Sequence, residues 1–487
     1  MGTFIAILIL TTAVAGLVKK LSERSVSLKR WSWHLGVLIE ATGVLIAILG
    51  FWPSDKPATP SDVSSIISEK VDSLQTDIFV KLDSDHEEVT CRMDRLEALI
   101  KKTAGQPEPD SSFLAEARSQ AECLEGIVET ALDKGIVAIG LQKYDEALTL
   151  LDIALKAAGE NLIQRAKVLF YIGLIHSKRG EYILAFELYD SCITDDPRKY
   201  GAWNNRGSAL SRLNRFDEAL NSYDSALAYK PDFQDAWYNR GIALSELGFH
   251  KEGIASYDSA LVYKPNYHEA WYNRGNALDN LNLYEESIAS YDSALVYKPD
   301  KHEAWYNRGI ALGKLNLYEE SIASYDSALV YKPDGHKAWH NRGNALHKLG
   351  LHRESIASYD SALVYKPDDN EAWSNRGIAL GRLNRFDEAL NSYDSALAYK
   401  PDFQDAWYNR GIALSELGFH KEEIASYDSA LVYKPDNHNA WYNRGIALGV
   451  LNRFDEALNS CDSAQKYSMD KSEVIVLRQW ILDLMND

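Results

Sequence analysis

One segment of 34 residues recurs along more than half of the chain, and this repetition restricts the possible folds more than any other feature. From Ala202 onward, AWNNRGSALSRLNRFDEALNSYDSALAYKPDFQD is followed by AWYNRGIALSELGFHKEGIASYDSALVYKPNYHE and by further copies. One tryptophan marks each copy: Trp203, Trp237, Trp271, Trp305, Trp339, Trp373, Trp407 and Trp441. A unit this short cannot bury an apolar face alone, so its neighbours must complete the core. The repetition therefore predicts a row of stacked units instead of one globule.

Within each unit, apolar side chains recur with the period of an α-helix in two successive stretches. In the first unit they are Trp203, Gly207, Leu210 and Leu213, then Phe216, Ala219, Leu220, Tyr223, Ala226 and Leu227. Gly207 and its copies leave room for close helix approach beside the large tryptophan. Between the stretches stands a residue that tolerates the left-handed backbone ending a helix. These turn residues are Asn214, Gly248, Asn282, Asn316, Gly350, Asn384, Gly418 and Asn452. Each unit is therefore predicted to be a helical hairpin, which Pro231 and its copies separate from the next.

A 34-residue helix–turn–helix unit with this pattern resembles the tetratricopeptide repeat family. The resemblance implies an all-α solenoid, a right-handed superhelix of helical hairpins that binds proteins and is not an enzyme. Eight regular repeats are expected over 202–473, preceded by degenerate hairpins over 113–201. In the degenerate part, Gly173 and Pro197 lie 34 residues before their regular counterparts, and Tyr144 matches the start of a second helix. Residues 474–487 are expected to form a C-terminal capping helix.

Two rows of side chains are expected to face away from the packed stripe of the first helices, along an inner surface. One row is Asn205, Asn239, Asn273, Asn307, Asn341, Asn375, Asn409 and Asn443; beside it run Tyr238, Tyr272, Tyr306, His340, Tyr408 and Tyr442. Asparagine offers a donor and an acceptor to a peptide backbone, and tyrosine adds contact area. The asparagine row resembles that of O-linked N-acetylglucosamine transferases, where it grips extended peptide. The resemblance implies peptide binding; the alternative is that the asparagines only solvate or cap the groove.

Two other positions carry charge. Arg206 and its copies flank the packed stripe, and each unit has an aspartate in its second helix, such as Asp224 and Asp258. We expect a structural Arg–Asp ladder, since arginine suits half-buried carboxylate pairing; a ligand clamp is the alternative. Glu423 stands where other repeats have Ala219 or Gly253, and an unpaired glutamate there would loosen the packing.

Composition argues against several other functions. The net charge is −18, which repels phosphate backbones, so nucleic acid is not an expected partner. The four cysteines are scattered and form no CxxC pair, so neither a disulfide framework nor a zinc site is expected. His268, His302, His336 and His438 are equivalent positions of different repeats, too far apart to share a metal. No catalytic triad spacing, phosphate-binding loop or cofactor fingerprint is present, so no enzyme activity and no cofactor are predicted.

The N-terminal region, 1–52, has two apolar runs, 1–18 and 35–52, each about as long as a minimal membrane span. The loop between them carries Lys19, Lys20, Arg24, Lys29 and Arg30. The positive-inside rule places such a loop in the cytoplasm and the repeats outside it, which means the periplasm in a Gram-negative cell. Two spans are thus predicted to tether a multi-pass membrane protein. A signal peptide over the first run is the alternative.

Between the predicted spans and the repeats lie a linker and a helical segment. Residues 53–62 contain three prolines and are expected to be extended. Residues 63–104 carry a narrow apolar stripe that includes Ile67, Val71, Leu74 and Leu96. This stripe is typical of a short coiled-coil stalk through which two chains could pair, or of an amphipathic helix lying on the membrane or on the repeats. Residues 105–112 are expected to form a second linker.

These features predict a membrane-tethered scaffold that binds extended peptide segments. Two other functions stay open at this point. The chain could be an assembly or secretion factor whose membrane hairpin contacts the subunits of a membrane complex. It could also be a non-catalytic subunit of an enzyme complex.

Overall fold

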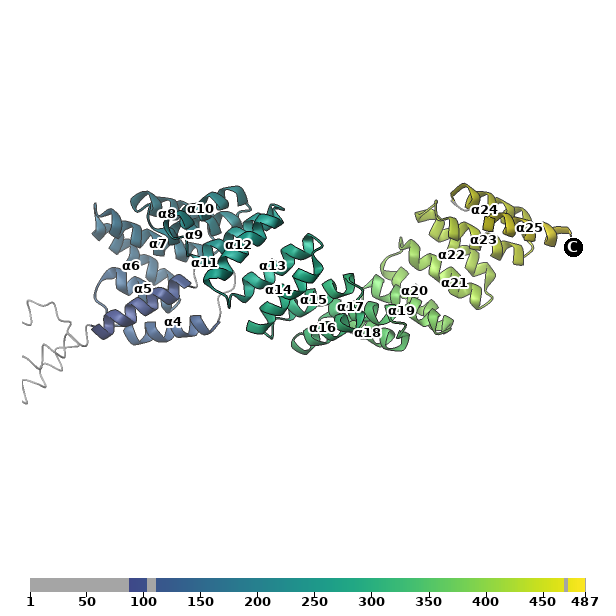
Figure 1. Cartoon of the computed structure of the whole chain (residues 1–487), viewed down its shortest axis with the longest axis horizontal. Helices are drawn as coiled ribbons and strands as arrows, with labels where there is room; N and C mark the ends of the chain where they lie inside the picture. Colours follow the sequence, from purple (N-terminus) through teal and green to yellow (C-terminus); the bar gives the residue numbers. More distant parts are fainter. Residues whose placement is uncertain (1–86, 103–110, 468–471, 487) are drawn as a thin grey trace, which may run out of the picture. The chain divides into compact units, whose positions relative to one another are not determined.

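A computed structural model describes residues 87–102, 111–467 and 472–486. Every regular element in these residues is an α-helix, and the helices follow one another as packed hairpins (Figure 1). The chain divides into two compact units, one ending at Ala243 and the other beginning at Leu244. The division falls within α11 (Gln234–Glu246), and each unit is described by itself.

The first unit contains a helix over residues 87–102, the helices α4 to α10 and the start of α11. Their bounds are α4 Ser111–Leu124, α5 Ala131–Gly140, α6 Tyr144–Ala158, α7 Leu162–Lys178, α8 Tyr182–Asp195, α9 Tyr200–Arg212 and α10 Phe216–Tyr229. The hairpins are α5 with α6, α7 with α8, and α9 with α10. The predicted second-helix start at Tyr144 is confirmed, because α6 begins there. The helix α7 has 17 residues and is longer than the 13-residue α9 that matches it in the next hairpin.

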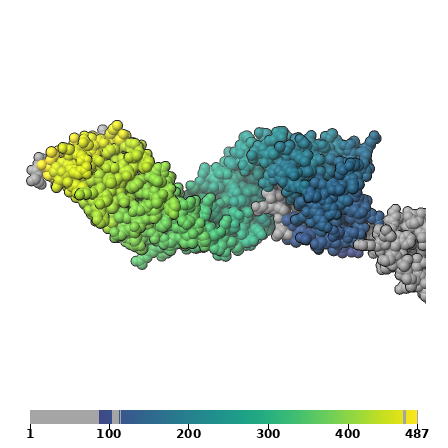
Figure 2. All heavy atoms as spheres, turned by 180° about the vertical axis from the view of Figure 1, so that it is seen from behind, coloured from purple at the N-terminus to yellow at the C-terminus, as the bar shows by residue number. Residues whose placement is uncertain are grey.

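The second unit contains the end of α11, α12 His250–Tyr263, and the regular hairpins that follow. Their bounds are α13 His268–Asn280, α14 Tyr284–Tyr297, α15 His302–Lys314, α16 Tyr318–Tyr331, α17 His336–Lys348, α18 His352–Tyr365, α19 Asn370–Arg382, α20 Phe386–Tyr399, α21 Gln404–Glu416, α22 His420–Tyr433, α23 His438–Val450 and α24 Phe454–Tyr467. Successive odd- and even-numbered helices pair as hairpins, and each hairpin packs against the next. In Figure 2 the atoms of neighbouring hairpins in this unit touch one another along the chain, from teal-green to yellow.

The turn within each hairpin follows the sequence prediction. The turn residue has a positive φ in every regular repeat, for example 58° at Asn214, 82° at Gly248 and 57° at Asn384. Only glycine and, at small cost, asparagine adopt this conformation readily, which explains why these two residue types alternate there. The local sequence therefore determines where each first helix ends.

The helix-interior glycines allow close helix contact, but their neighbour is not the tryptophan named by the sequence prediction. A Cβ atom added at Gly207 would lie 2.6 Å from Cε1 of Tyr223 in the second helix of the same hairpin. The same clash occurs at Gly275 with Tyr291 and at Gly377 with Tyr393. The buried tyrosine ring fills the space that the glycine leaves, so the two positions act as one packing unit.

The helix over 87–102 belongs to the first unit. Its side chains Leu96 and Ile100 are 0% and 3% exposed in the core that includes Ala121 of α4 and Ile136 of α5. Glu97 also pairs with Lys167 of α7 at 2.7 Å. Over 87–102 the chain agrees with the second of the two sequence alternatives, an amphipathic helix lying on the repeats. The rest of the predicted stalk, 63–86, lies outside the described residues.

The predicted capping helix is present as α25 (Ser472–Asn486), which packs on α23 and α24. Its Val474, Leu477 and Ile481 are buried against the last hairpin. Arg478 pairs with Asp462 of α24, as Arg444 pairs with Asp428 one repeat earlier. The helix therefore occupies the place of the first helix of a further repeat.

The predicted membrane spans, 1–18 and 35–52, the linker 53–62 and residues 105–110 of the predicted linker 105–112 lie outside the described residues. Residues 111 and 112 are not linker, because α4 already begins at Ser111. In the part of the chain that is described, no helix combines the length and the apolar character that a membrane crossing requires.

Candidate functional site

A ladder of ion pairs joins successive hairpins, as the sequence predicts. Each first-helix arginine donates through Nε to an aspartate in the second helix of the preceding hairpin, at 2.7 Å for Arg274 and Asp258 and for Arg308 and Asp292. The same arginine donates through a second nitrogen to a serine of its own hairpin, such as Ser290, at 2.6 Å. Both hydrogen bonds are made to other residues of the chain. The arginines therefore stabilise the packing between repeats and have few N–H donors left for a ligand.

A second constant contact fixes the start of each first helix. The indole N–H of Trp271 donates to the carbonyl oxygen of Pro265 at 2.9 Å, and the same bond recurs in the other regular repeats. The guanidinium of Arg274 lies 5.8 Å from the centre of the Trp271 ring, within cation–π range. Sequence reasoning missed the indole bond, although the constant six-residue spacing from proline to tryptophan could have indicated it.

The predicted Asn and Tyr rows lie together on the first helices, at the seam where successive first helices touch. In the second unit we call them the Tyr–Asn row: Asn273, Asn307, Asn341, Asn375, Asn409 and Asn443, with Tyr272, Tyr306, His340, Ser374, Tyr408 and Tyr442. All except the buried Ser374 are half-buried. The helices α13, α15, α17, α19 and α21 contact one another in turn, which explains the partial burial.

Hydrogen bonds link this row from one repeat to the next. The side-chain amide of Asn307 donates to the hydroxyl of Tyr272 at 3.1 Å, and that of Asn341 donates to the hydroxyl of Tyr306 at 3.1 Å. Burial raises the pKa of Tyr272 and Tyr306, although the hydrogen bonds from asparagine lower it, so both hydroxyls are neutral at pH 7. Each tyrosine keeps its own O–H to donate, and each asparagine keeps its carbonyl oxygen to accept.

In the first unit the corresponding side chains are closed off. Asn205 and Asn239 are 5% and 8% exposed, and Tyr238 is 7% exposed. Asn239 donates to the side-chain oxygen of Asn204, which itself donates to Asn205. The predicted binding residues therefore divide into a buried set in the first unit and a half-buried set in the second.

Two repeats of the second unit vary the row. His340 replaces tyrosine and lies 3.3 Å from both Asp369 and Asn375. Burial alone would raise the pKa of Asp369, but its hydrogen bonds with His340 and the amide of Ala372 lower it to about 2. In the next repeat Ser374 replaces tyrosine, and Asn409 consequently makes no side-chain hydrogen bond to the described residues. Asn409 thus presents an amide that the seam does not use.

Glu423 is buried, as its repeat position predicts, but the expected loosening is not seen. Its carboxylate is paired with Nδ1 of His420 at 2.8 Å, and α22 continues regularly through it. In three other repeats this position holds a serine that donates to a first-helix carbonyl, such as Ser287 to Gly275. The position is therefore one where a polar side chain can find a partner between the two helices of a hairpin.

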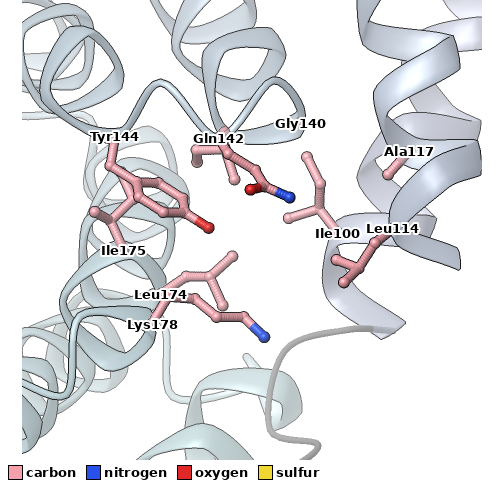
Figure 3. A pocket seen from close by; sticks show the side chains of 10 residues that line it. Ile100, Leu114, Ala117, Gly140, Gln142, Tyr144, Leu174, Ile175 and Lys178 are labelled. Atoms are coloured by element: carbon pink, nitrogen blue, oxygen red, sulfur yellow. The ribbon is translucent and has the colours of Figure 1, made fainter. Parts of the chain in front are cut away.

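An apolar recess in the first unit lies between the 87–102 helix, α4 and α7 (Figure 3). Ile100, Leu114 and Leu174 line it, and the ammonium of Lys178 stands at its edge. Its volume of about 30 Å³ admits only a water or two, since one water needs roughly 10–15 Å³. In the described residues no three His, Cys, Asp or Glu side chains gather as a metal ion would require.

The repeats match the family model described as "Tetratricopeptide repeat" over nearly all of 132–470. The matched residues are 132–199, 204–267, 241–304, 272–336, 306–372, 340–390, 374–434 and 424–470. The chain belongs to the tetratricopeptide repeat family. Members of this family are generally non-catalytic scaffolds for protein interaction. The family model that matches this tetratricopeptide repeat protein is not that of an enzyme family.

Several solved structures resemble this tetratricopeptide repeat protein at low identity. YrrB, described as "a TPR protein with an unusual peptide-binding site", is 19% identical over 39% of this chain and 99% of that chain, with a TM-score of 0.36. MamA is 21% identical over 34% of this chain and 96% of that one, with a TM-score of 0.33. A tetratricopeptide repeat protein from Parabacteroides merdae is 19% identical over 51% and 98%, with a TM-score of 0.37. No curated protein matches the chain.

Proposed function

We propose that the second unit binds extended peptide segments along the Tyr–Asn row. The observation that carries this proposal is the hydrogen-bond pattern of the row. Asn307 and Asn341 donate their amide hydrogens to the preceding tyrosines, which leaves an acceptor on each asparagine and a donor on each tyrosine. A peptide backbone presents the complementary groups at every residue, so such a row suits main-chain recognition without reading side chains.

The proposal leaves out the predicted binding residues of the first unit. Asn205, Asn239 and Tyr238 expose too little area to contact a peptide. The proposed binding residues are therefore those of the second unit, from Asn273 to Asn443. The asparagine row of O-linked N-acetylglucosamine transferases, which this row resembles, supports the same mode of binding.

We further propose that residues 1–52 tether this scaffold to a membrane. The two uncharged or nearly uncharged runs at 1–18 and 35–52 and the basic loop between them support a pair of spans with the repeats on the extracytoplasmic side. Pairing of two chains through the predicted stalk would have to use 63–86, because Leu96 and Ile100 of that stalk are buried within the first unit.

The chain offers a matched pair of variants that separates binding from stability. Asn341→Ala removes a hydrogen bond to Tyr306, whereas Asn409→Ala removes none within the described residues. We expect Asn341→Ala to lower the free energy of unfolding by about 1 kcal/mol and Asn409→Ala to change it little. Both should weaken the binding of a fluorescent, unstructured peptide library to the full-length chain, measured by anisotropy.

Asn437→Ala is the control, since that asparagine caps the start of α23 and lies outside the row. If the wild type binds the library and Asn409→Ala binds it equally tightly, the row is not the binding surface.

A further inference from the structure

A polar recess opens beside the Tyr–Asn row in the second unit. It is lined by Asn276, Asp279 and Asn280 of α13, Tyr291 of α14, and Asn307 and Ile310 of α15. Its volume is about 190 Å³, many times the roughly 10–15 Å³ that one water molecule needs. The recess is therefore large enough to receive a side chain.

Two of the donors in the wall of this recess, the hydroxyl of Tyr291 and the amide of Asn307, are engaged in hydrogen bonds within the protein. The hydroxyl of Tyr291 donates to the side-chain oxygen of Asn276 at 2.8 Å. The amide nitrogen of Asn307 donates to that same oxygen at 2.9 Å and to the hydroxyl of Tyr272 at 3.1 Å. These two donors are therefore not free to bind a ligand in the recess.

Asp279 supplies the charge. One of its carboxylate oxygens is buried and has no hydrogen-bond partner in the described part of the chain. Burial raises the pKa of this carboxyl, although the charge of Lys314 lowers it. Lys314 forms no ion pair with it within 4.0 Å. A half-buried carboxylate with no ion-pair partner gains stability from a cation that also donates hydrogen bonds.

This charge is specific to one repeat. The positions equivalent to Asp279 elsewhere are Ser211, Ser245, Gly313, His347, Gly381, Ser415 and Gly449. No other regular repeat has an acid at this position, so Asp279 can distinguish one register of a bound peptide from the others.

We propose that the recess at Asp279 is a subsite for a basic side chain, the ammonium of lysine or the guanidinium of arginine, on a peptide that the Tyr–Asn row holds. The inference rests on the proposed peptide-binding function and adds a side-chain preference and a register to it. The row contacts the backbone, and Asp279 selects the residue that lies over α13.

The test uses the full-length chain and capped, fluorescein-labelled Gly/Ser peptides that contain one central lysine or one acetyl-lysine. The two peptides differ only in the charge and donors of one side chain. We expect the lysine peptide to bind about tenfold more tightly, equivalent to roughly 1.4 kcal/mol, and the difference to shrink as salt is added. Asp279→Asn keeps the shape of the side chain and should abolish the preference.

Glu285→Gln is the matched control, because it removes one negative charge from the exposed start of α14 in the same repeat. It should keep the preference. If both peptides bind the wild type equally, or if Glu285→Gln loses the preference as Asp279→Asn does, the subsite is refuted while peptide binding stands. If neither peptide binds, the proposed function fails together with the subsite. Circular dichroism of Asp279→Asn excludes unfolding as the cause of a lost preference.

Discussion

Two glycines in one helix should respond in opposite ways to the same substitution. Gly377 and Gly381 lie one turn apart in α19. A Cβ atom at Gly377 would stand 2.6 Å from Cε1 of Tyr393, a residue that is only 4% exposed. A Cβ atom at Gly381 would meet nothing within 4 Å. Neither glycine has a positive φ, so backbone strain does not distinguish the two positions.

The magnitudes follow from helix propensity and overpacking. Glycine to alanine in a helix gains up to about 1 kcal/mol, and overfilling a packed core costs about 1–3 kcal/mol. Gly377→Ala should therefore lower the free energy of unfolding by about 1 kcal/mol. Gly381→Ala, near the end of the helix, should raise it by about 0.5 kcal/mol.

Urea unfolding followed by circular dichroism ranks the two variants by their midpoints. Hydrogen exchange of the α19 and α20 amides then shows whether the change is local, as expected for a repeat array in which each hairpin contacts only its neighbours. Equal stabilisation by both substitutions would refute the reasoning, because it would mean that the glycine–tyrosine contact does not limit how closely the two helices approach.

Two further predictions concern the charged contacts. Arg274→Met should lower the free energy of unfolding by roughly 1–2 kcal/mol, seen as a lower urea midpoint, because it breaks the bonds to Asp258 and Ser290. It should leave peptide affinity within about twofold. A loss of affinity without a loss of stability would mean that the arginines clamp a ligand. Asp369 has a folded pKa of about 2, below its ordinary value of 3.8, so its contribution to stability is present above pH 4 and is lost as the pH falls through 2. His340→Tyr, the residue of other repeats, should shrink this acid-dependent loss in an acid titration, and an unchanged titration would contradict the assignment.

The parts of the fold that the sequence predicts best are those set by local chemistry. Asn214 and Gly248 end their helices because of their own backbone preferences, and Tyr144 begins α6 because it starts an apolar period. The Arg–Asp ladder could also be predicted from the sequence, since an arginine at the edge of a packed stripe needs a carboxylate nearby.

Other features depend on which residues meet in space. The bond from Asn307 to Tyr272 joins positions 35 residues apart and exists because successive first helices touch. Nothing in the local sequence distinguishes the buried Asn239 from the half-buried Asn273, because both occur in the same WYNRG motif. The place of the 87–102 helix likewise follows from its contact with α4 and α5, since an apolar stripe alone suits a second chain equally well.

The central claim is that peptides bind on the first helices of the second unit, and site-specific photocrosslinking tests it most directly. A photoreactive phenylalanine analogue would replace Tyr306 in the Tyr–Asn row or, in a second variant, Tyr331 at the exposed end of the second helix α16, where the side chain is 47% exposed. We predict that an unstructured labelled peptide crosslinks to the full-length chain from position 306 and not from position 331. Crosslinking from 331 alone, or equally from both, would contradict the account.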